Sequence, residues 1–205
     1  MSSKSFNYSV FINCPFDKRY RRLFRSIVFS IIDSGFNPRC ALEVDESGEN
    51  RLNRIIEIIR VCKYGIHDIS RTSIDSRNRL PRFNMPLELG LFLSAKHFGR
   101  YAQKRKNCIV LDKEEYRYQK FISDIAGIDI KAHNNSVKKT ISIVRDWLSS
   151  YSNEIIPSGS KLYERYDEFM RQLPRQAKEV HLEVSELTFG DFVTLSAAWI
   201  EENNI

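Results

Sequence analysis

Glu88 is the residue whose surroundings in the sequence most clearly indicate chemistry. From Leu87 to Ala95 the only polar residues are Glu88 and Ser94, which is typical of a helix buried on most of its faces. A charge buried without a partner is costly, so a carboxylate at this position needs a reason. Two remain open: Glu88 caps free N–H groups in the first helical turn, or it lines a cleft as a catalytic carboxylate.

Other polar side chains stand where predicted strands end. Asn13 follows the apolar run 8–12, Glu43 follows 36–42, and Asp68 lies at the end of 64–69. The carboxyl ends of parallel strands share one edge of a sheet, and ligands bind beyond that edge. We therefore expect these side chains to meet Glu88 there, and this convergence favours a functional role for Glu88.

The elements that must position these residues alternate along the chain. The pattern predicts an α/β fold: a flavodoxin-like three-layer sandwich with a five-stranded parallel sheet in the order 2-1-3-4-5, plus a C-terminal helical extension. The predicted strands are 8–12, 36–42, 64–69, 108–111 and 128–130, and the predicted helices of this part are 20–32, 51–59, 87–98, 114–126 and 137–148.

A polar stretch at residues 152–159 predicts a linker between an α/β domain, residues 1–151, and the helical C-terminal extension, residues 160–205. Thr188 and Asp191 have the spacing of a helix-capping pair. Two amphipathic helices cannot bury their own apolar faces. They must pack on the α/β domain or on a partner, and a homo-oligomer joined through these helices is one of the two options.

Composition limits the class of protein and its partners. Hydrophobic residues make up 42% of the 205-residue chain, as in a folded globular protein. The net charge of +6 is uneven, because residues 160–205 carry 5 Lys and Arg against 9 Asp and Glu. The basic remainder indicates an anionic partner, either nucleic acid or a phosphorylated small molecule. Four scattered cysteines indicate reduced core thiols in a cytoplasmic protein, and no zinc site or membrane span is expected.

Two segments resemble known families. Val10-Phe11-Ile12 followed by a polar loop resembles the opening of Toll/interleukin-1 receptor (TIR) domains. The run 87–96 around Glu88, followed by the strand-like run 107–111, is similar to the segment that carries the catalytic glutamate of TIR-type NAD hydrolases. It is equally similar to the Glu-Leu-Gly segment of nucleoside 2-deoxyribosyltransferases. Bacterial members of these families often serve in antiphage defence.

The resemblance implies cleavage or transfer at an N-glycosidic bond of NAD or of another nucleoside or nucleotide. Glu88 would attack the anomeric carbon or stabilise the charge that develops there, and Asp68 would orient it or act as its acid/base partner. NAD or a nucleotide is then the substrate, with no resident cofactor or metal. The residues expected to bind this substrate are Asn13, Phe16, Arg39, Glu43, Arg54, Arg82 and Asn84.

Two other functions stay open. The domain could be a non-catalytic module that binds a nucleotide signal or assembles with other proteins. It could also bind nucleic acid through the basic segments 18–25, 71–82 and 100–106, although no helix-turn-helix, zinc or stacking motif accompanies their charge.

Overall fold

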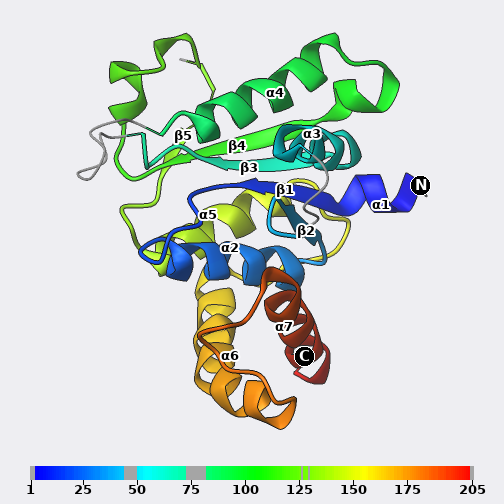
Figure 1. The fold of residues 1–205 in the computed structure, drawn as a ribbon, viewed down its shortest axis with the longest axis vertical. Helices are drawn as coiled ribbons and strands as arrows, with labels where there is room; N and C mark the ends of the chain where they lie inside the picture. The colour runs from blue at the N-terminus through cyan, green and yellow to red at the C-terminus, as the bar shows by residue number, and fades with distance from the viewer. Residues whose placement is uncertain (1–2, 44–49, 73–81, 126, 129, 204–205) are drawn as a thin grey trace. The chain divides into compact units, whose positions relative to one another are not determined.

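A five-stranded, all-parallel sheet organises the chain (Figure 1). The computed structural model describes residues 3–43, 50–72, 82–125, 127–128 and 130–203. The strand order β2-β1-β3-β4-β5 confirms the predicted flavodoxin-like α/β fold. The strands are β1 (Ser9–Asn13), β2 (Asn37–Cys40), β3 (Tyr64–Asp68), β4 (Asn107–Asp112) and β5 (Ile130–Ala132).

Strands β1 and β3 are buried at every residue, as expected for central strands of a parallel sheet. Their register pairs Asn13 with His67, while Asp68 pairs with Leu111 on β4. The carboxyl ends of the strands therefore share one edge, and the polar residues that follow them start from neighbouring positions.

Helices separate the strands at nearly all of the predicted positions. An N-terminal helix, α1, has no counterpart in the sequence prediction. The helices are α1 (Ser3–Tyr8), α2 (Arg21–Asp33), α3 (Arg51–Val61), α4 (Asn84–Phe98), α5 (Val137–Ser149), α6 (Gly159–Glu179) and α7 (Phe189–Glu202). None of these described helices is both long enough and apolar enough to cross a membrane.

The helix predicted over residues 114–126 is wrong. The structure has two short 3₁₀ helices there, η2 (Arg117–Lys120) and η3 (Ser123–Ile125). Tyr116 has a left-handed backbone with φ of 57°, which prevents a continuous helix. The apolar residues of this stretch, Tyr118 and Ile125, are instead buried in a cluster with Leu89 of α4.

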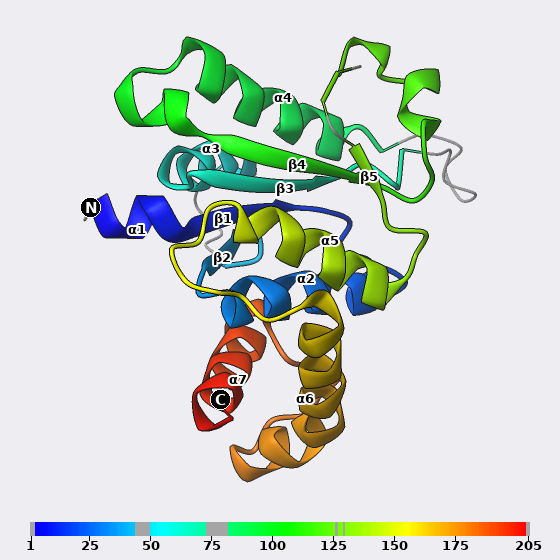
Figure 2. The ribbon, with the colours of Figure 1, turned by 180° about the vertical axis from the view of Figure 1, so that it is seen from behind.

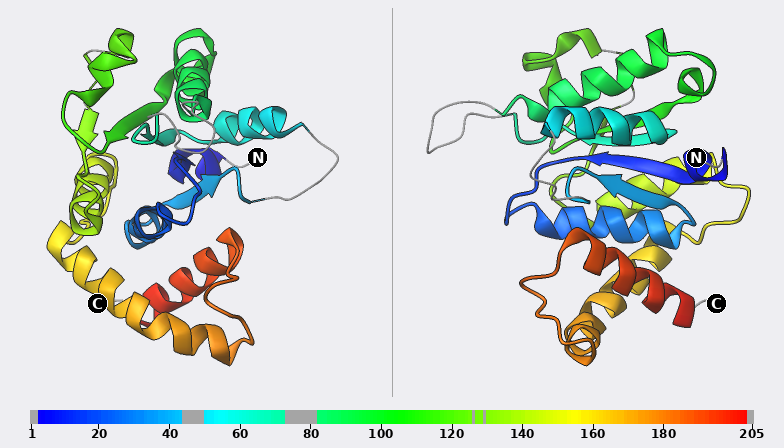
Figure 3. Two further views of the ribbon diagram at one scale, coloured as in Figure 1. Left: turned by 60° about the vertical axis from the view of Figure 1, so that its left-hand side comes forward. Right: turned by 45° about the vertical axis from the view of Figure 1, so that its right-hand side comes forward.

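The chain divides into two compact units, residues 1–20 with 39–135 and residues 21–38 with 136–205. In the first unit, α3 and α4 lie along the same face of the sheet (Figure 3, left). A buried cluster joins them, in which Ile55 and Ile59 of α3 and Phe92 of α4 pack around Phe11 of β1. These contacts fix the helix that carries Glu88 on the sheet.

Lys106 is a buried cation that strengthens this unit away from the strand ends. Its side chain is 1% exposed, and its Nζ donates to the carbonyl oxygen of Ile59 at 2.6 Å and to that of Cys62. The Nζ also lies 4.6 Å from the ring centre of Phe92. Burial lowers the pKa of Lys106 to about 8. Lys106 therefore donates to two carbonyl oxygens at the C-terminal end of α3.

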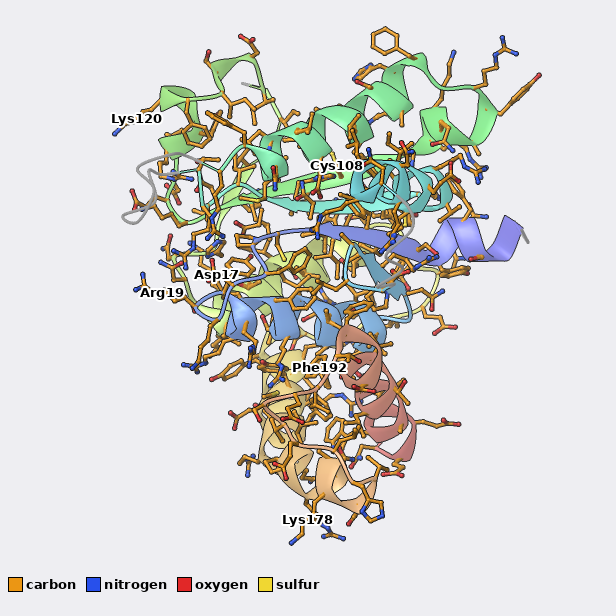
Figure 4. All side chains as sticks on the ribbon, viewed as in Figure 1. Asp17, Arg19, Cys108, Lys120, Lys178 and Phe192 are labelled. Carbon is orange, nitrogen blue, oxygen red and sulfur yellow. The ribbon has the colours of Figure 1, made fainter. Side chains whose placement is uncertain are left out.

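The second unit packs α6 and α7 against α2, as Figures 2 and 4 show. Phe29 of α2 lies 5.2 Å from Phe169 and 5.9 Å from Trp199, measured between ring centres, and Phe192 contacts Phe169 at 5.6 Å. The predicted capping box of Thr188 and Asp191 is present. The C-terminal helices thus bury their apolar faces within the chain, and the expected linker at 152–159 lies inside this unit.

A buried ion pair joins the same three helices. The guanidinium of Arg165 on α6 donates to both carboxylate oxygens of Asp33 on α2, at 2.8 and 2.9 Å. It also donates to the carbonyl oxygen of Asn203 at 2.8 Å and lies over the ring of Trp199. The Asp33 side chain is 5% exposed, so its charge depends on this one guanidinium for compensation.

We predict that Arg165→Ala lowers the free energy of unfolding by about 3 kcal/mol, because it leaves Asp33 buried without its cation. Urea denaturation would measure the loss. The matched control is Arg175→Ala, which removes the exposed pair with Glu179 and should change stability by less than about 0.5 kcal/mol. Equal effects of the two substitutions would contradict a structural role for the buried pair.

Candidate functional site

Helix α4 places Glu88 in its second turn, not its first. The helix begins at Asn84, its N-cap residue Phe83 makes no side-chain capping bond, and its first turn holds no acidic residue. The hypothesis that Glu88 caps the free N–H groups of this helix is therefore wrong. A different reason must account for the carboxylate.

Glu88 is a buried acid without a partner. Its side chain is 7% exposed, on the same side of α4 as Met85, Leu89 and Phe92. Within the described part of the chain it makes no hydrogen bond or ion pair. Burial raises the pKa of Glu88 to about 7, and the positive charge of Arg51 on α3 acts in the opposite direction. Near neutral pH the group therefore exists in both protonation states.

The amide of Asn13 holds the start of α4 against the strand ends. Its Nδ2 donates to the carbonyl oxygen of Met85 at 2.8 Å and contacts Nδ1 of His67 at 3.0 Å. Met85 lies three residues before Glu88, so this bond fixes the turn that leads to the carboxylate. Both amide hydrogens of Asn13 are engaged, and the side chain is 1% exposed. The predicted sugar contact of Asn13 stays a prediction, with only its carbonyl oxygen left to make it.

His67 completes that contact as a neutral ring. Burial and the charge of Lys106 lower the pKa of His67 to about 3. Since Nδ1 accepts a hydrogen bond from the amide N–H of Asn13, the ring hydrogen is assigned to Nε2. That nitrogen has no hydrogen-bond partner among the described residues, and the ring packs against Phe11 and Phe92. His67 therefore orients Asn13 and does not act as a cation.

Asp68 lies at the centre of a second buried network. One carboxylate oxygen accepts from the hydroxyl of Tyr20 at 2.5 Å, and the other accepts from the backbone N–H of Ser70 at 2.8 Å. Nε2 of His133 lies 3.0 Å from the first oxygen, outside hydrogen-bond geometry, so we describe it as an electrostatic contact. Asp68 is fully buried, and a ligand would reach it only by displacing these groups. Its predicted catalytic role stays a prediction.

Cys14 lies near both Asp68 and Glu88, at the carboxyl end of β1. Burial raises the pKa of its thiol well above the usual value, and the negative charges of Asp68, Cys40 and Glu88 add to this effect. The charges of both carboxylates therefore act on the Cys14 thiol. The sequence indicates only a core thiol at this position, although Cys14 directly follows Asn13.

Arg39 and Glu43 compensate each other at the end of β2. The guanidinium Nε donates to both oxygens of Glu43 at 2.8 Å, and the backbone N–H of Cys40 donates to the same carboxylate at 2.7 Å. Burial raises the pKa of Cys40 to about 12, and the charges of Glu43 and Glu88 act in the same direction. Glu43 therefore belongs to the same edge. A phosphate that binds Arg39 would have to compete with the Glu43 carboxylate for its guanidinium.

The other predicted substrate-binding residues surround the edge more loosely. Asp17 lies in the turn after β1 (Figure 4), where Arg71 and Arg82 both approach it at 3.4 Å. Phe16 packs against the cluster around Phe11. Two further residues stand at helix starts, Arg54 in α3 and Asn84 as the exposed first residue of α4.

Asp112 is an acid of this edge that is absent from the predicted site. It ends β4, is fully buried, and accepts from Nε of Arg117 at 2.8 Å. Burial raises its pKa, and its Oδ2 atom has no hydrogen-bond partner among the described residues. Its position after a predicted strand is the signal that could have identified it. In the described ranges, no group of three His, Cys, Asp or Glu is placed to hold a metal ion.

Comparison with known proteins adds no family to this geometry. No protein-family model matches the chain, and no curated protein matches it significantly. The resemblance to TIR domains and nucleoside deoxyribosyltransferases therefore enters the functional argument as a proposal.

The burial of Glu88 predicts a stability effect that depends on pH. Its folded-state pKa is raised, so its favourable contribution is present below the unfolded-state value and is lost as the pH rises through about 7. Glu88→Gln cannot ionise. We predict that the variant gains about 2 kcal/mol over the natural chain between roughly pH 5 and pH 8.

Urea denaturation of both chains at the two pH values measures this gain. Both chains contain His67, so its contribution to the pH dependence of stability cancels when the free energies of unfolding of the two chains are subtracted. A stability difference that does not change with pH would show that Glu88 titrates as an ordinary exposed acid.

Proposed function

We propose that the chain cleaves or transfers the N-glycosidic bond of a nucleotide, with NAD as one candidate substrate and Glu88 as the group that meets the sugar. The observation that carries this proposal is the partnerless burial of Glu88. Desolvating a carboxylate costs stability, and no described contact compensates it. Acids whose pKa is strongly raised by burial are candidates for functional groups.

The chemistry requires the ionised form of Glu88. A carboxylate oxygen attacks C1′ of the sugar, and the C1′–N bond breaks with its electron pair leaving on the base. Water, or the hydroxyl or base of an acceptor, then displaces the carboxylate from C1′. The nicotinamide of NAD is cationic and leaves as a neutral molecule without a proton. A neutral purine would need one, which an acid near Glu88 would have to supply.

The surrounding charges give the other residues their roles in this proposal. Arg51 already acts on Glu88 and opposes the pKa rise caused by burial, so it favours the reactive carboxylate. Arg54 and Arg82 are the candidates to hold phosphate, because a guanidinium matches phosphate oxygens. Asp68 would act through the packing of the edge, since its oxygens are occupied by Tyr20 and Ser70.

The enclosure of Asp68 also favours a second candidate function. With Asp68 engaged, Glu88 has no accessible acid/base partner among the predicted site residues. A module that binds a nucleotide signal without turning it over would need none. A role in antiphage defence, which the family resemblance implies, is compatible with either activity.

Release of free base from NAD and from deoxynucleotides tests the proposal. We expect Glu88→Gln to lower release at least about a hundredfold, because the amide is a poor nucleophile and cannot take a proton. The matched control is Glu154→Gln, an exposed glutamate of the second unit, which should leave release unchanged. Release that survives in Glu88→Gln would remove Glu88 from the mechanism, and tight binding without release would favour the signal-binding module.

The pH dependence distinguishes a nucleophile from an acid. If ionised Glu88 attacks the sugar, release from NAD should rise about tenfold between roughly pH 6 and pH 8, since the carboxylate fraction follows a pKa of about 7. Steady-state rates across this range measure it. A rate that falls over the same interval would assign the protonated carboxyl group to the reactive form.

A further inference from the structure

The outward side of α4 carries large apolar side chains that the described residues leave exposed. Leu87 is 54% exposed and Phe98 is 87% exposed, while Phe83 and Tyr101, which flank the helix, are 66% and 90% exposed. Their spacing places Phe83, Leu87 and Phe98 on one side of the helix axis, and Tyr101 begins the short helix η1 (Tyr101–Arg105) that follows α4. We call Phe83, Leu87, Phe98 and Tyr101 the α4 face. A group of exposed large apolar side chains is typical of an interaction site.

Gly90 lies on the same side of the helix and is exposed. A glycine inside a helix lowers its stability. No atom lies within 4 Å of the position that a Cβ would occupy at Gly90, so nothing in the described chain requires glycine there. Close approach by another backbone would require it. The residue therefore favours a helix as the occupant of the α4 face.

The charge around the C-terminal end of the α4 face has one sign. Residues 89–111 contain no Asp or Glu. Lys96 and His97 lie in the last turn of α4, and Arg100, Lys104 and Arg105 follow it. An occupant must therefore place acidic groups at this end.

Helix α7 of the same chain has the complementary surface. Its outward residues are small and exposed: Thr194, Ala197 and Ala198. Glu201 and Glu202 stand at its C-terminal end, where a negative charge opposes the helix dipole. Neither makes an ion pair with a residue in the described ranges. Cations from outside the unit would account for this unfavourable placement.

We propose that the α4 face of one copy binds helix α7 of a second copy, with both helices running in the same direction. The helices match in length, with 15 and 14 residues. In this orientation Glu201 and Glu202 meet the basic end of α4, while the small residues of α7 lie along Leu87 and Gly90. Because the two surfaces differ, the contact is head-to-tail. In a dimer, one copy has an unoccupied α4 face and the other has an unoccupied α7, so that further copies can bind.

Sedimentation of the full chain over a concentration series tests the contact. The natural chain should form species larger than a dimer. We expect Phe98→Glu on α4 and Ala198→Glu on α7 each to raise the dissociation constant about tenfold or more, since each places a charge within the contact, and the carboxylate introduced at position 98 would also face Glu201 and Glu202. The matched control is Ile155→Glu, which changes an aliphatic residue that is 98% exposed and lies on neither helix. It should leave association unchanged.

A mixture of the two variants gives the sharper result. Phe98→Glu keeps a working α7, and Ala198→Glu keeps a working α4 face, so equal amounts of both should form a dimer and nothing larger. Circular dichroism of each variant alone establishes that it is folded.

Three outcomes would overturn the proposal. The first is a natural chain that stays monomeric throughout the series, and the second is a mixture of folded variants that contains only monomers. The third is a monomeric chain that binds vesicles containing phosphatidylserine through Phe98, which would assign the α4 face to a membrane surface.

Discussion

The amide of Asn13 is the constraint on which the geometry of the strand edge depends. It joins the end of β1 to His67 on β3 and to the first turn of α4 through the Met85 carbonyl. A buried amide with both hydrogens engaged is costly to disrupt, because each broken bond leaves a desolvated donor. The position of α4 relative to the strand ends, and with it the position of Glu88, follows from these two contacts and from the packing of Phe92.

Most acids near this edge have a hydrogen-bond or ion-pair partner in the described ranges, and Glu88 has none. Asp68 has Tyr20 and the backbone of Ser70, Asp112 has Arg117, and Glu43 has Arg39. These pairs account for their own burial and stabilise the fold around them. Among the described residues, Arg51 supplies the positive charge that acts on Glu88, without a hydrogen bond or ion pair. A group that the fold does not stabilise is the natural place to look for a function, since functional sites are often strained or underpacked.

The sequence predicts the sheet and the burial of Glu88 because both depend on local patterns. Alternating strand-like and helix-like segments indicate a doubly wound parallel sheet, for which 2-1-3-4-5 is a common strand order, and the apolar surroundings of Glu88 are visible in a nine-residue window. The helix predicted over 114–126 is wrong because Tyr116 adopts a left-handed backbone conformation. Glycine or asparagine usually marks such a position in a sequence, and a tyrosine does not. The enclosure of Asp68 could not be predicted, because Tyr20 and His133 come from opposite ends of the first unit.

The structure also shows where the unevenly distributed charges of the chain lie. Most acidic residues of 160–205 belong to α6 and α7, which pack through an apolar interior around Phe29, and their side chains are mostly exposed. The basic stretch after α4 likewise accompanies exposed aromatic rings instead of a solvated helix face.

The central claim is that Glu88 is a buried carboxyl group with no partner, and its titration tests this most directly. Carbon-13 NMR of the glutamate side-chain carboxyl groups, with Glu88→Gln to assign the resonance, would follow the group across the pH range. The account predicts a midpoint near the pKa of about 7. A midpoint at the ordinary glutamate value, about 4.3, would show that the carboxylate is hydrated or paired, and would contradict it.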